Sequence, residues 1–234
     1  MRTKKSFSAK KKGILIAAAC VLALAVGSGI YFGVTKGGIT LAPAVRSYVI
    51  NINNAEEVAG FVDYVFVGRV EKQMDARYED VFERESEDGE KTLVGAPYTL
   101  YEVTVLENLK GNLKVNEPIR IEKEGGISMD GKFLSVAEGD SLPEEGSLFV
   151  FAVSAGADGS LLANHNYKLM KTKLTEKAIG KMQPEQLQKA MQAELEEAEA
   201  QADYKRFAEA CKNEVPFARE RYTASAEWLE AATQ

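Results

Sequence analysis

Few residues of this 234-residue chain have the types and the spacing that catalysis or metal binding requires. The single histidine lies in Asn164-His165-Asn166, and no second histidine or group of cysteines completes a zinc site. The P-loop, the Rossmann glycine motif, G-x-S-x-G and H-E-x-x-H are all absent. The sequence therefore predicts no catalytic residue, no metal site and no cofactor, and His165 is interpreted as a structural residue.

The other side chains that could do chemistry form a dense group of carboxylates between residues 74 and 95. The charged residues of this stretch include Asp75, Arg77, Glu79, Asp80, Glu83, Arg84, Glu85, Glu87, Asp88 and Glu90. Carboxylates can bind calcium, but the pattern D-x-[DN]-x-[DN]-G is missing. High charge and low hydrophobicity favour a solvated hairpin extension or a mobile loop instead. Capture of an ion or ligand by the acidic loop at 75–90 is the alternative.

The two cysteines do not indicate a disulfide. Cys20 and Cys211 lie near opposite ends of the chain, so we do not expect them to pair. Cys211 is interpreted as a buried small apolar residue, and an intermolecular link is the alternative.

The longest uncharged stretch, residues 13–34, predicts a transmembrane helix. A helix rises about 1.5 Å per residue, so this stretch is long enough to cross a hydrocarbon core of roughly 30 Å. Six basic residues and no acidic residue precede it, whereas only Lys36 follows closely. The positive-inside rule makes residues 1–12 a cytoplasmic tail and places the bulk of the chain outside the cytoplasm. We therefore expect a single-pass protein of the cell membrane, with the lipid bilayer as the partner of residues 13–34.

A cleaved signal peptide is the alternative for the same stretch, and the protein would then be secreted. Gly27, Ser28 and Gly29 are small residues of the kind found at cleavage sites. The apolar region of a signal peptide usually has only about 7–15 residues, so the longer stretch here favours an uncleaved signal-anchor.

Charge excludes some classes of partner for the exported part of the chain. Seven of the 29 basic residues and none of the 35 acidic residues lie in the first 36 positions, so the rest of the chain is strongly acidic. Nucleic acids and anionic membrane surfaces attract basic patches. We therefore expect no nucleic-acid partner.

Short segments with alternating apolar and polar residues predict a β domain over residues 45–170, after a linker at 35–44. The predicted strands cover 45–52, 64–72, 97–106, 118–124, 147–153 and 167–170, with a hairpin turn at Asp130-Gly131. A short helix over about 54–62 begins at Asn53-Asn54, with asparagine as its cap. Six or seven short strands with one small helix indicate an all-β barrel or sandwich.

The order of these segments resembles a known class of barrel. VFVGRV (65–70), YTLYEVTVLENLKG (98–111), IRIEKEGG (119–126) and SLFVFAV (147–153) are similar to the OB-fold barrel of the netrin and metalloproteinase-inhibitor class, especially in exported bacterial domains. The resemblance implies an extracytoplasmic barrel whose exposed loops bind a partner. The disulfide framework and the free N-terminal cysteine of the animal inhibitors are missing, so no inhibitory residue can be transferred.

The chain changes character after residue 170. Gln183-Pro184-Glu185 opens a predicted helix of about 28 residues, since proline is tolerated in a first turn. Val215-Pro216 ends that region, and a second predicted helix over 217–232 completes a helical hairpin. A coiled-coil dimer is possible, although sustained heptads are missing. The residues that could contact a partner are Trp228, Phe217 and Tyr222. Alternatively, Trp228 fastens the terminal helix.

The sequence thus predicts a mainly β fold: an OB-like barrel of five to seven strands with an N-terminal transmembrane helix and a C-terminal helical hairpin at 171–234. The expected function is that of a membrane-tethered extracytoplasmic binding or assembly module, without catalytic activity, that binds a protein partner. The alternatives are a cell-envelope enzyme and an ion- or ligand-binding protein that uses the acidic loop.

If residues 13–34 serve only as a tether, removing them should release a folded domain. Residues 45–234 expressed alone should then remain in the soluble fraction after centrifugation and unfold cooperatively on heating. An insoluble or unfolded product would contradict the tether hypothesis.

Overall fold

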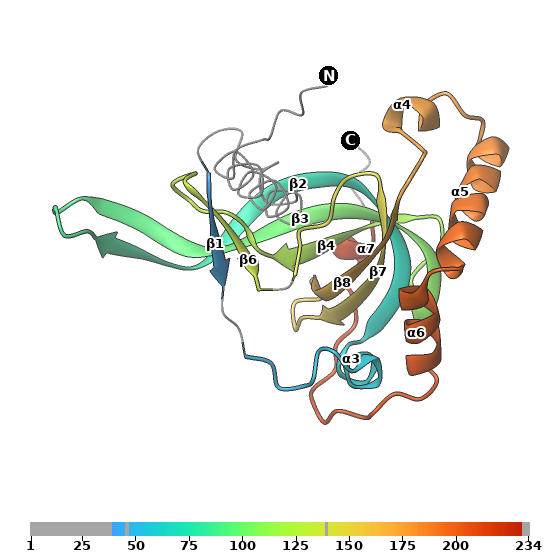
Figure 1. Cartoon of the computed structure of the whole chain (residues 1–234), viewed down its shortest axis with the longest axis horizontal. Coiled ribbons are helices and arrows are strands. Elements are labelled where there is room, and N and C mark those ends of the chain that lie inside the picture. Colours follow the sequence, from blue (N-terminus) through green and yellow to red (C-terminus); the bar gives the residue numbers. More distant parts are fainter. Residues whose placement is uncertain (1–38, 45–46, 139, 231–234) are drawn as a thin grey trace, which may run out of the picture.

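The computed structural model of the chain describes residues 39–44, 47–138 and 140–230 (Figure 1). The predicted cytoplasmic tail (1–12), the predicted membrane span (13–34) and residues 35–38 of the predicted linker lie outside these residues. Among the residues described, no helix is both long and apolar enough to cross a membrane.

Five strands form a closed barrel. They are β2 (Tyr64–Glu85), β3 (Lys91–Lys110), β4 (Pro118–Glu124), β7 (Ser147–Ala155) and β8 (Leu161–Lys171). Their order around the barrel is β2-β3-β4-β8-β7, with β4 and β8 parallel and the other neighbours antiparallel. The predicted mainly β class and the barrel are confirmed, and the mixed barrel of five strands is compatible with an OB-like barrel.

Alternation along the strands sorts the apolar side chains into two cores. The first fills the barrel and contains Phe66, Tyr101, Val103, Ile119, Ile121, Phe149, Phe151 and Leu161. The second lies on the outer face of β2 and β7 beneath the helices and contains Val65, Val67, Leu148, Val150 and Ala152. Strand β7 therefore has apolar residues on both faces because each face is covered, as SLFVFAV predicts.

A small second sheet lies beside the barrel, and it corrects the prediction of a linker at 35–44. Strand β1 (Thr40–Ala44) pairs in parallel with β6 (Phe133–Ala137), which also pairs with the short β5 (Gly126–Ile127). The end of the predicted linker is therefore a strand, and a fragment that begins at residue 39 keeps β1 whereas one that begins at residue 45 loses it.

The strand predicted at 45–52 is wrong, because residues 47–52 form no strand. Their asparagines start the next helix instead: the Asn51 amide donates to Glu57 Oε2 at 2.8 Å, and the Asn51 side chain accepts from the Asn53 amide at 3.1 Å. Helix α3 (Ala55–Phe61) follows, and Asn54 Oδ1 accepts the amides of Glu56 and Glu57. The predicted short helix and its asparagine cap are confirmed.

Strands β2 and β3 continue beyond the barrel as a two-stranded ribbon (left in Figure 1). We name the part from Arg77 to Tyr98 the arm. Its strands pair from Arg77–Tyr98 to Glu85–Lys91, with irregular register between Glu79 and Phe82. Of the two structures considered for the charged stretch, the hairpin extension is the one observed.

The C-terminal helices differ from the predicted hairpin. The helices are α4 (Glu176–Ile179), α5 (Pro184–Glu199), α6 (Ala202–Ala210) and α7 (Ala226–Leu229). Pro184 starts α5 as predicted, but the expected single helix is broken where Gln201 adopts an extended conformation. The break lets α6 turn onto the barrel, where Phe207 and Ala210 are fully buried. The long helical region therefore lies along the barrel.

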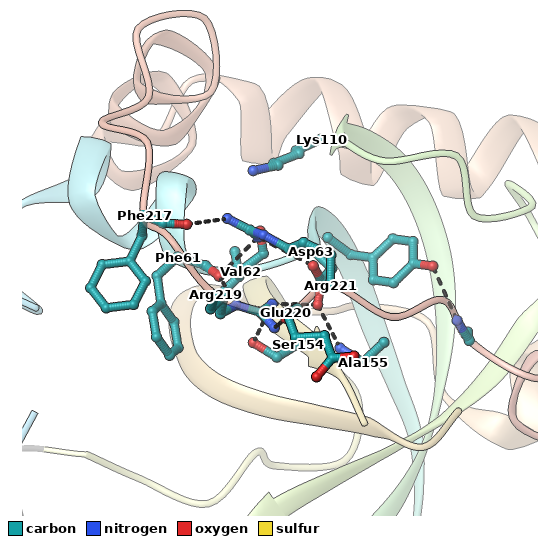
Figure 2. A network of polar contacts seen from close by, with 12 residues as sticks. Phe61, Val62, Asp63, Lys110, Ser154, Ala155, Phe217, Arg219, Glu220 and Arg221 are labelled. Carbon is teal, nitrogen blue, oxygen red and sulfur yellow. Dashed lines mark hydrogen bonds and ion pairs between the residues drawn. The ribbon is translucent and has the colours of Figure 1, made fainter. Parts of the chain in front are cut away.

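The second predicted helix, over 217–232, is also wrong, because most of this region is an extended strap and only α7 is helical. We name residues 214–225 the strap (Figure 2). The Val215 amide donates to Glu56 O at 3.0 Å, and Arg219 Nε donates to Phe61 O at 2.6 Å. Arg221 Nη1 donates to Val62 O at 2.7 Å. The last carbonyl groups of a helix have no hydrogen-bond partner within that helix. The two arginines donate to these carbonyl groups at the end of α3.

The carboxylate of Asp63 fixes the strap to the barrel (Figure 2). Asp63 Oδ2 lies 2.5 Å from Arg219 Nη2 and accepts the Ala155 amide at 2.9 Å. Asp63 Oδ1 lies 3.2 Å from Arg221 Nη1. Because the Asp63 side chain is only 8% exposed, these donors replace the water that would otherwise solvate its charge.

We expect Asp63→Ala to detach the strap. Loss of a buried charge partner should lower the free energy of unfolding by about 3 kcal/mol. Limited trypsin digestion followed by mass spectrometry should show faster cleavage after Arg219 and Arg221. Glu83→Ala is the matched control, because it breaks the exposed pair with Lys91. Equal cleavage rates in the two variants would show that Asp63 does not hold the strap.

Candidate functional site

The three residues predicted to contact a partner pack against the rest of the protein. Phe217 lies edge-on to Phe61, with 5.2 Å between the ring centroids. Tyr222 and Trp228 are half-buried against the core that fills the barrel. The structure therefore brings Tyr222 and Trp228 to the same core. Phe217 lies apart from them and packs against Phe61 of α3.

Exposed apolar side chains are found instead on the arm. Val81, Phe82 and Leu93 are 47%, 59% and 52% exposed. Val81 and Phe82 lie between Asp80 and Glu83 at the irregular register of β2, where Asp80 has a φ of +48°, and Leu93 pairs with Glu83 across the ribbon. The sequence analysis identified this stretch only as acidic, because the apolar residues among the charges are too few to form a strand pattern.

The base of the arm is held by an ion pair between the half-exposed Arg77 and the buried Glu122. Arg77 donates through Nε and Nη2 to the two carboxylate oxygens of Glu122 on β4, and its guanidinium lies 4.6 Å from the centre of the Tyr98 ring. The hydrogen bonds that Arg77 donates to Glu122 raise the pKa of Arg77, so its guanidinium stays charged. Glu122 is buried because Arg77 covers it. The arm therefore leaves the barrel in a defined direction.

A cavity of about 220 Å³ lies on the other side of the β4–β8 junction. Most of its wall is apolar and comes from residues 47–52, from α3 and from β8; the apolar lining includes Val49, Ile50, Ile52, Val58, Phe61, Val62, Leu162 and Ala163. The polar part of the lining consists of Ser47, Tyr48, Lys123, Glu124, Asp140, Asn164 and His165. The cavity thus combines apolar walls with a few convergent polar groups, as small-molecule sites do.

Lys123 and Asp140 form a buried ion pair in this cavity, with side chains 3% and 8% exposed. Lys123 Nζ also donates to Asn164 O at 3.3 Å. Burial lowers the pKa of His165 below its usual 6.5, and the positive charge of Lys123 lowers it further, while Asp140 opposes the shift. The imidazole is therefore neutral at pH 7 and lies 5.5 Å from the Tyr48 ring.

A larger groove, of about 770 Å³, separates the barrel from α4 and α5. In it the buried Arg69 donates to Glu71 Oε1 at 2.9 and 2.6 Å, and Thr104 Oγ1 donates to the same oxygen at 2.5 Å. The other charged residues of the lining are Lys72, Glu102, Glu145 and Lys171. Because acidic and basic groups are mixed, the groove favours no one ligand charge.

Cys211 is half-buried and forms no disulfide. Burial raises the pKa of its thiol to about 11, so the thiol is protonated at neutral pH and is a weak nucleophile. Within residues 39–44, 47–138 and 140–230, no three or more His, Cys, Asp and Glu side chains lie close enough together to hold a metal ion.

The comparisons with known proteins give no family for this chain. Neither a scan against models of protein families nor a search of curated proteins found a match. The structure itself defines the class: a mainly β protein built on a closed mixed barrel of five strands.

Sequence reasoning found His165 but missed the residues around it. Lys123 and Asp140 lie 17 positions apart in the sequence. Asn164 lies near Lys123 only because β4 pairs in parallel with β8. The one available signal was the predicted end of a strand at Lys123-Glu124, which gives no indication of burial.

The low pKa of His165 makes stability depend on pH. In the unfolded chain His165 takes up a proton near pH 6.5, whereas in the folded protein it does so only at lower pH, so stability falls as the pH is lowered from about 7 toward 5. We expect His165→Gln to remove this part of the fall. Urea unfolding midpoints of both proteins at pH 7.5 and 5 measure the difference, and no other histidine contributes. Equal pH dependence in the two proteins would contradict the assignment.

Proposed function

We propose that the protein is a membrane-tethered binding module that acts outside the cytoplasm, without catalysis, and presents its arm to a protein partner. The observation that carries this proposal is the exposure of Val81, Phe82 and Leu93 on a ribbon that extends away from the barrel (Figure 1). Phe82 pairs with Val94 and Leu93 pairs with Glu83, so the ribbon presents an exposed apolar side chain on each of its faces. Exposed apolar surface of this kind is available to a protein partner.

The charge of the arm supports a protein partner with a basic surface. From residue 75 to 91 the sequence has eight acidic and three basic residues. This charge repels nucleic acid and anionic lipid headgroups and attracts a partner that surrounds an apolar patch with lysine or arginine. Weaker binding at higher salt is the expected signature.

The edges of the ribbon are poorly suited to pairing with another strand. Register shifts in β2 at Gln73–Ala76 and Glu79–Phe82 twist the ribbon, and charged side chains line it. Such bulges and charges discourage edge-to-edge association. We therefore assign binding to the side chains of the arm.

The finer assignment of the fold belongs to the same proposal. The order β2-β3-β4-β8-β7, with its parallel β4–β8 pair, supports an OB fold of the netrin and metalloproteinase-inhibitor class. The uncharged stretch at 13–34 and the basic residues before it support the tether and its orientation.

Photo-crosslinking in cells tests the proposal on the full-length protein. A photoreactive amino acid at position 82 or 93 should give a discrete adduct, and the same group at position 115 should not. Val115 is the matched control because it is similarly exposed, at 46%, but lies off the arm.

The captured protein is then purified and its binding to the full-length protein is measured. Phe82→Ser with Leu93→Ser should weaken binding at least about tenfold, since truncated interface anchors often cost more than 1 kcal/mol. Val115→Ser should leave binding unchanged. Binding that survives the double substitution, or that does not weaken with salt, would overturn the proposal.

A further inference from the structure

We propose that the turn between β5 and β6 enters the headgroup region of the bilayer and so restricts how the barrel stands on the membrane. We name residues 128–133 the β5–β6 tip. This contact rests on the proposed function, because it requires the tether at residues 13–34. The bilayer is then a partner of the folded domain as well as of the tether.

The chain enters the small sheet beside the β5–β6 tip. Strands β1 and β6 lie side by side and are parallel, with Thr40 opposite Phe133 at the start of both (Figure 1). The Thr40 amide donates to Lys132 O at 2.8 Å. Because the strands are parallel, the chain reaches Thr40 from the end of the pair at which the tip lies.

Few residues separate Thr40 from the predicted membrane span. The span ends at Val34, six residues before Thr40. Six residues of fully extended chain cover at most about 22 Å. A bilayer measures about 40–45 Å with its headgroups, against roughly 30 Å for its hydrocarbon core, so each headgroup region is about 5–7 Å deep. The tether therefore keeps the β5–β6 tip close to the bilayer surface.

The β5–β6 tip carries apolar side chains that are partly exposed. Met129 is 37% exposed and Phe133 is 38% exposed. Transfer of such side chains from water to the boundary between headgroups and acyl chains is favourable. The side chain of Lys132 is 66% exposed, and its long apolar stem allows the ammonium group to stay among the headgroups. The tip thus has the composition of an interfacial anchor.

The polar groups of the tip are hydrogen-bonded to one another, which lowers the cost of moving them out of water. Asp130 Oδ1 accepts the Ser128 hydroxyl at 2.5 Å and the Lys132 amide at 3.1 Å. The Ser128 amide donates to Phe133 O at 2.8 Å. The side chains of Asp130 and Lys132 have opposite charges and lie 4.0 Å apart, so the contact does not require anionic lipids.

Hydrogen bonds fix the position of the tip relative to the barrel and the arm. Thr99 Oγ1 of β3 donates to Gly125 O at 2.7 Å, directly before β5. Tyr78 at the base of the arm donates its hydroxyl to Ile127 O at 3.0 Å. A bilayer contact at the tip would therefore restrict the direction of the arm as well. A restricted arm loses less freedom when it binds a partner.

Fluorescence quenching in vesicles tests the contact on the full-length protein. A polarity-sensitive fluorescent amino acid replaces Lys132 in one protein and Lys114 in another. Lys114 is the matched control because its side chain is also exposed, at 71%, and it precedes β4 whereas the tip follows β4. Both proteins are reconstituted into phosphatidylcholine vesicles with and without a lipid that carries a nitroxide quencher near its headgroup. Flotation with the vesicles after an alkaline wash measures the tether separately.

We expect the probe at position 132 to lose fluorescence to the quencher and to emit at shorter wavelength in vesicles than in detergent-free buffer after proteolytic release, and the probe at position 114 to show neither change. Met129→Ser with Phe133→Ser should remove the quenching at position 132. Val115→Ser should leave it unchanged, because Val115 is similarly exposed, at 46%, but precedes β4. Unchanged cooperative unfolding is the control for folding.

The possible failures distinguish this contact from the proposed function. Flotation without quenching at position 132 would overturn the contact and leave the tether and the arm unaffected. Equal quenching at positions 132 and 114, or quenching that persists after Met129→Ser with Phe133→Ser, would also overturn it. Failure to float would remove the tether and the contact together. If the double variant does not fold, the comparison of positions 132 and 114 in the otherwise unchanged protein still decides.

Discussion

Closure of the barrel depends on the parallel pairing of Glu122 and Lys123 on β4 with Leu162 and Ala163 on β8. Both residues of β4 are charged and buried, and a buried charge without a partner is strongly destabilising. Each finds its partner in a different part of the chain: Glu122 pairs with Arg77 at the base of the arm, and Lys123 pairs with Asp140 in the loop before β7. The junction thus positions both the arm and the cavity, because adjacent residues of a strand point to opposite faces.

The sequence predicted those parts of the fold whose structure is determined by neighbours along the chain. Alternation identified the barrel strands, Pro118–Glu124 with its observed bounds, and the Asn cap and Pro184 identified the starts of two helices. The prediction from sequence was wrong where contacts with residues far along the chain determine the local structure. Residues 217–225 have a helical spacing of apolar residues, yet Arg219 and Arg221 are extended because Asp63 and the end of α3 bind them. Residues 40–44 form a strand because β6 is available to pair.

The same distinction explains what could be known of the candidate sites. The acidic composition of the arm was visible in the sequence, but the exposure of Phe82 and Leu93 depends on the ribbon leaving the barrel. His165 was visible as the only histidine, whereas its place beside the Lys123–Asp140 pair in the lining of the cavity follows from barrel closure. Trp228 is the only tryptophan of the chain and was predicted to contact a partner. The residues next to it in the sequence do not indicate that it packs against the barrel core.

The strap has a consequence for the order in which the protein folds. Asp63 and Arg219 are separated by 156 positions, so their ion pair must wait until nearly all of the described chain has been made and the barrel has assembled. Contacts between such distant residues form slowly because a long loop must first be closed. Until then the carboxylate of Asp63 and the last carbonyl groups of α3 stay open to solvent. We therefore expect the contacts of the strap to form late in folding and to stabilise α3 only at that stage.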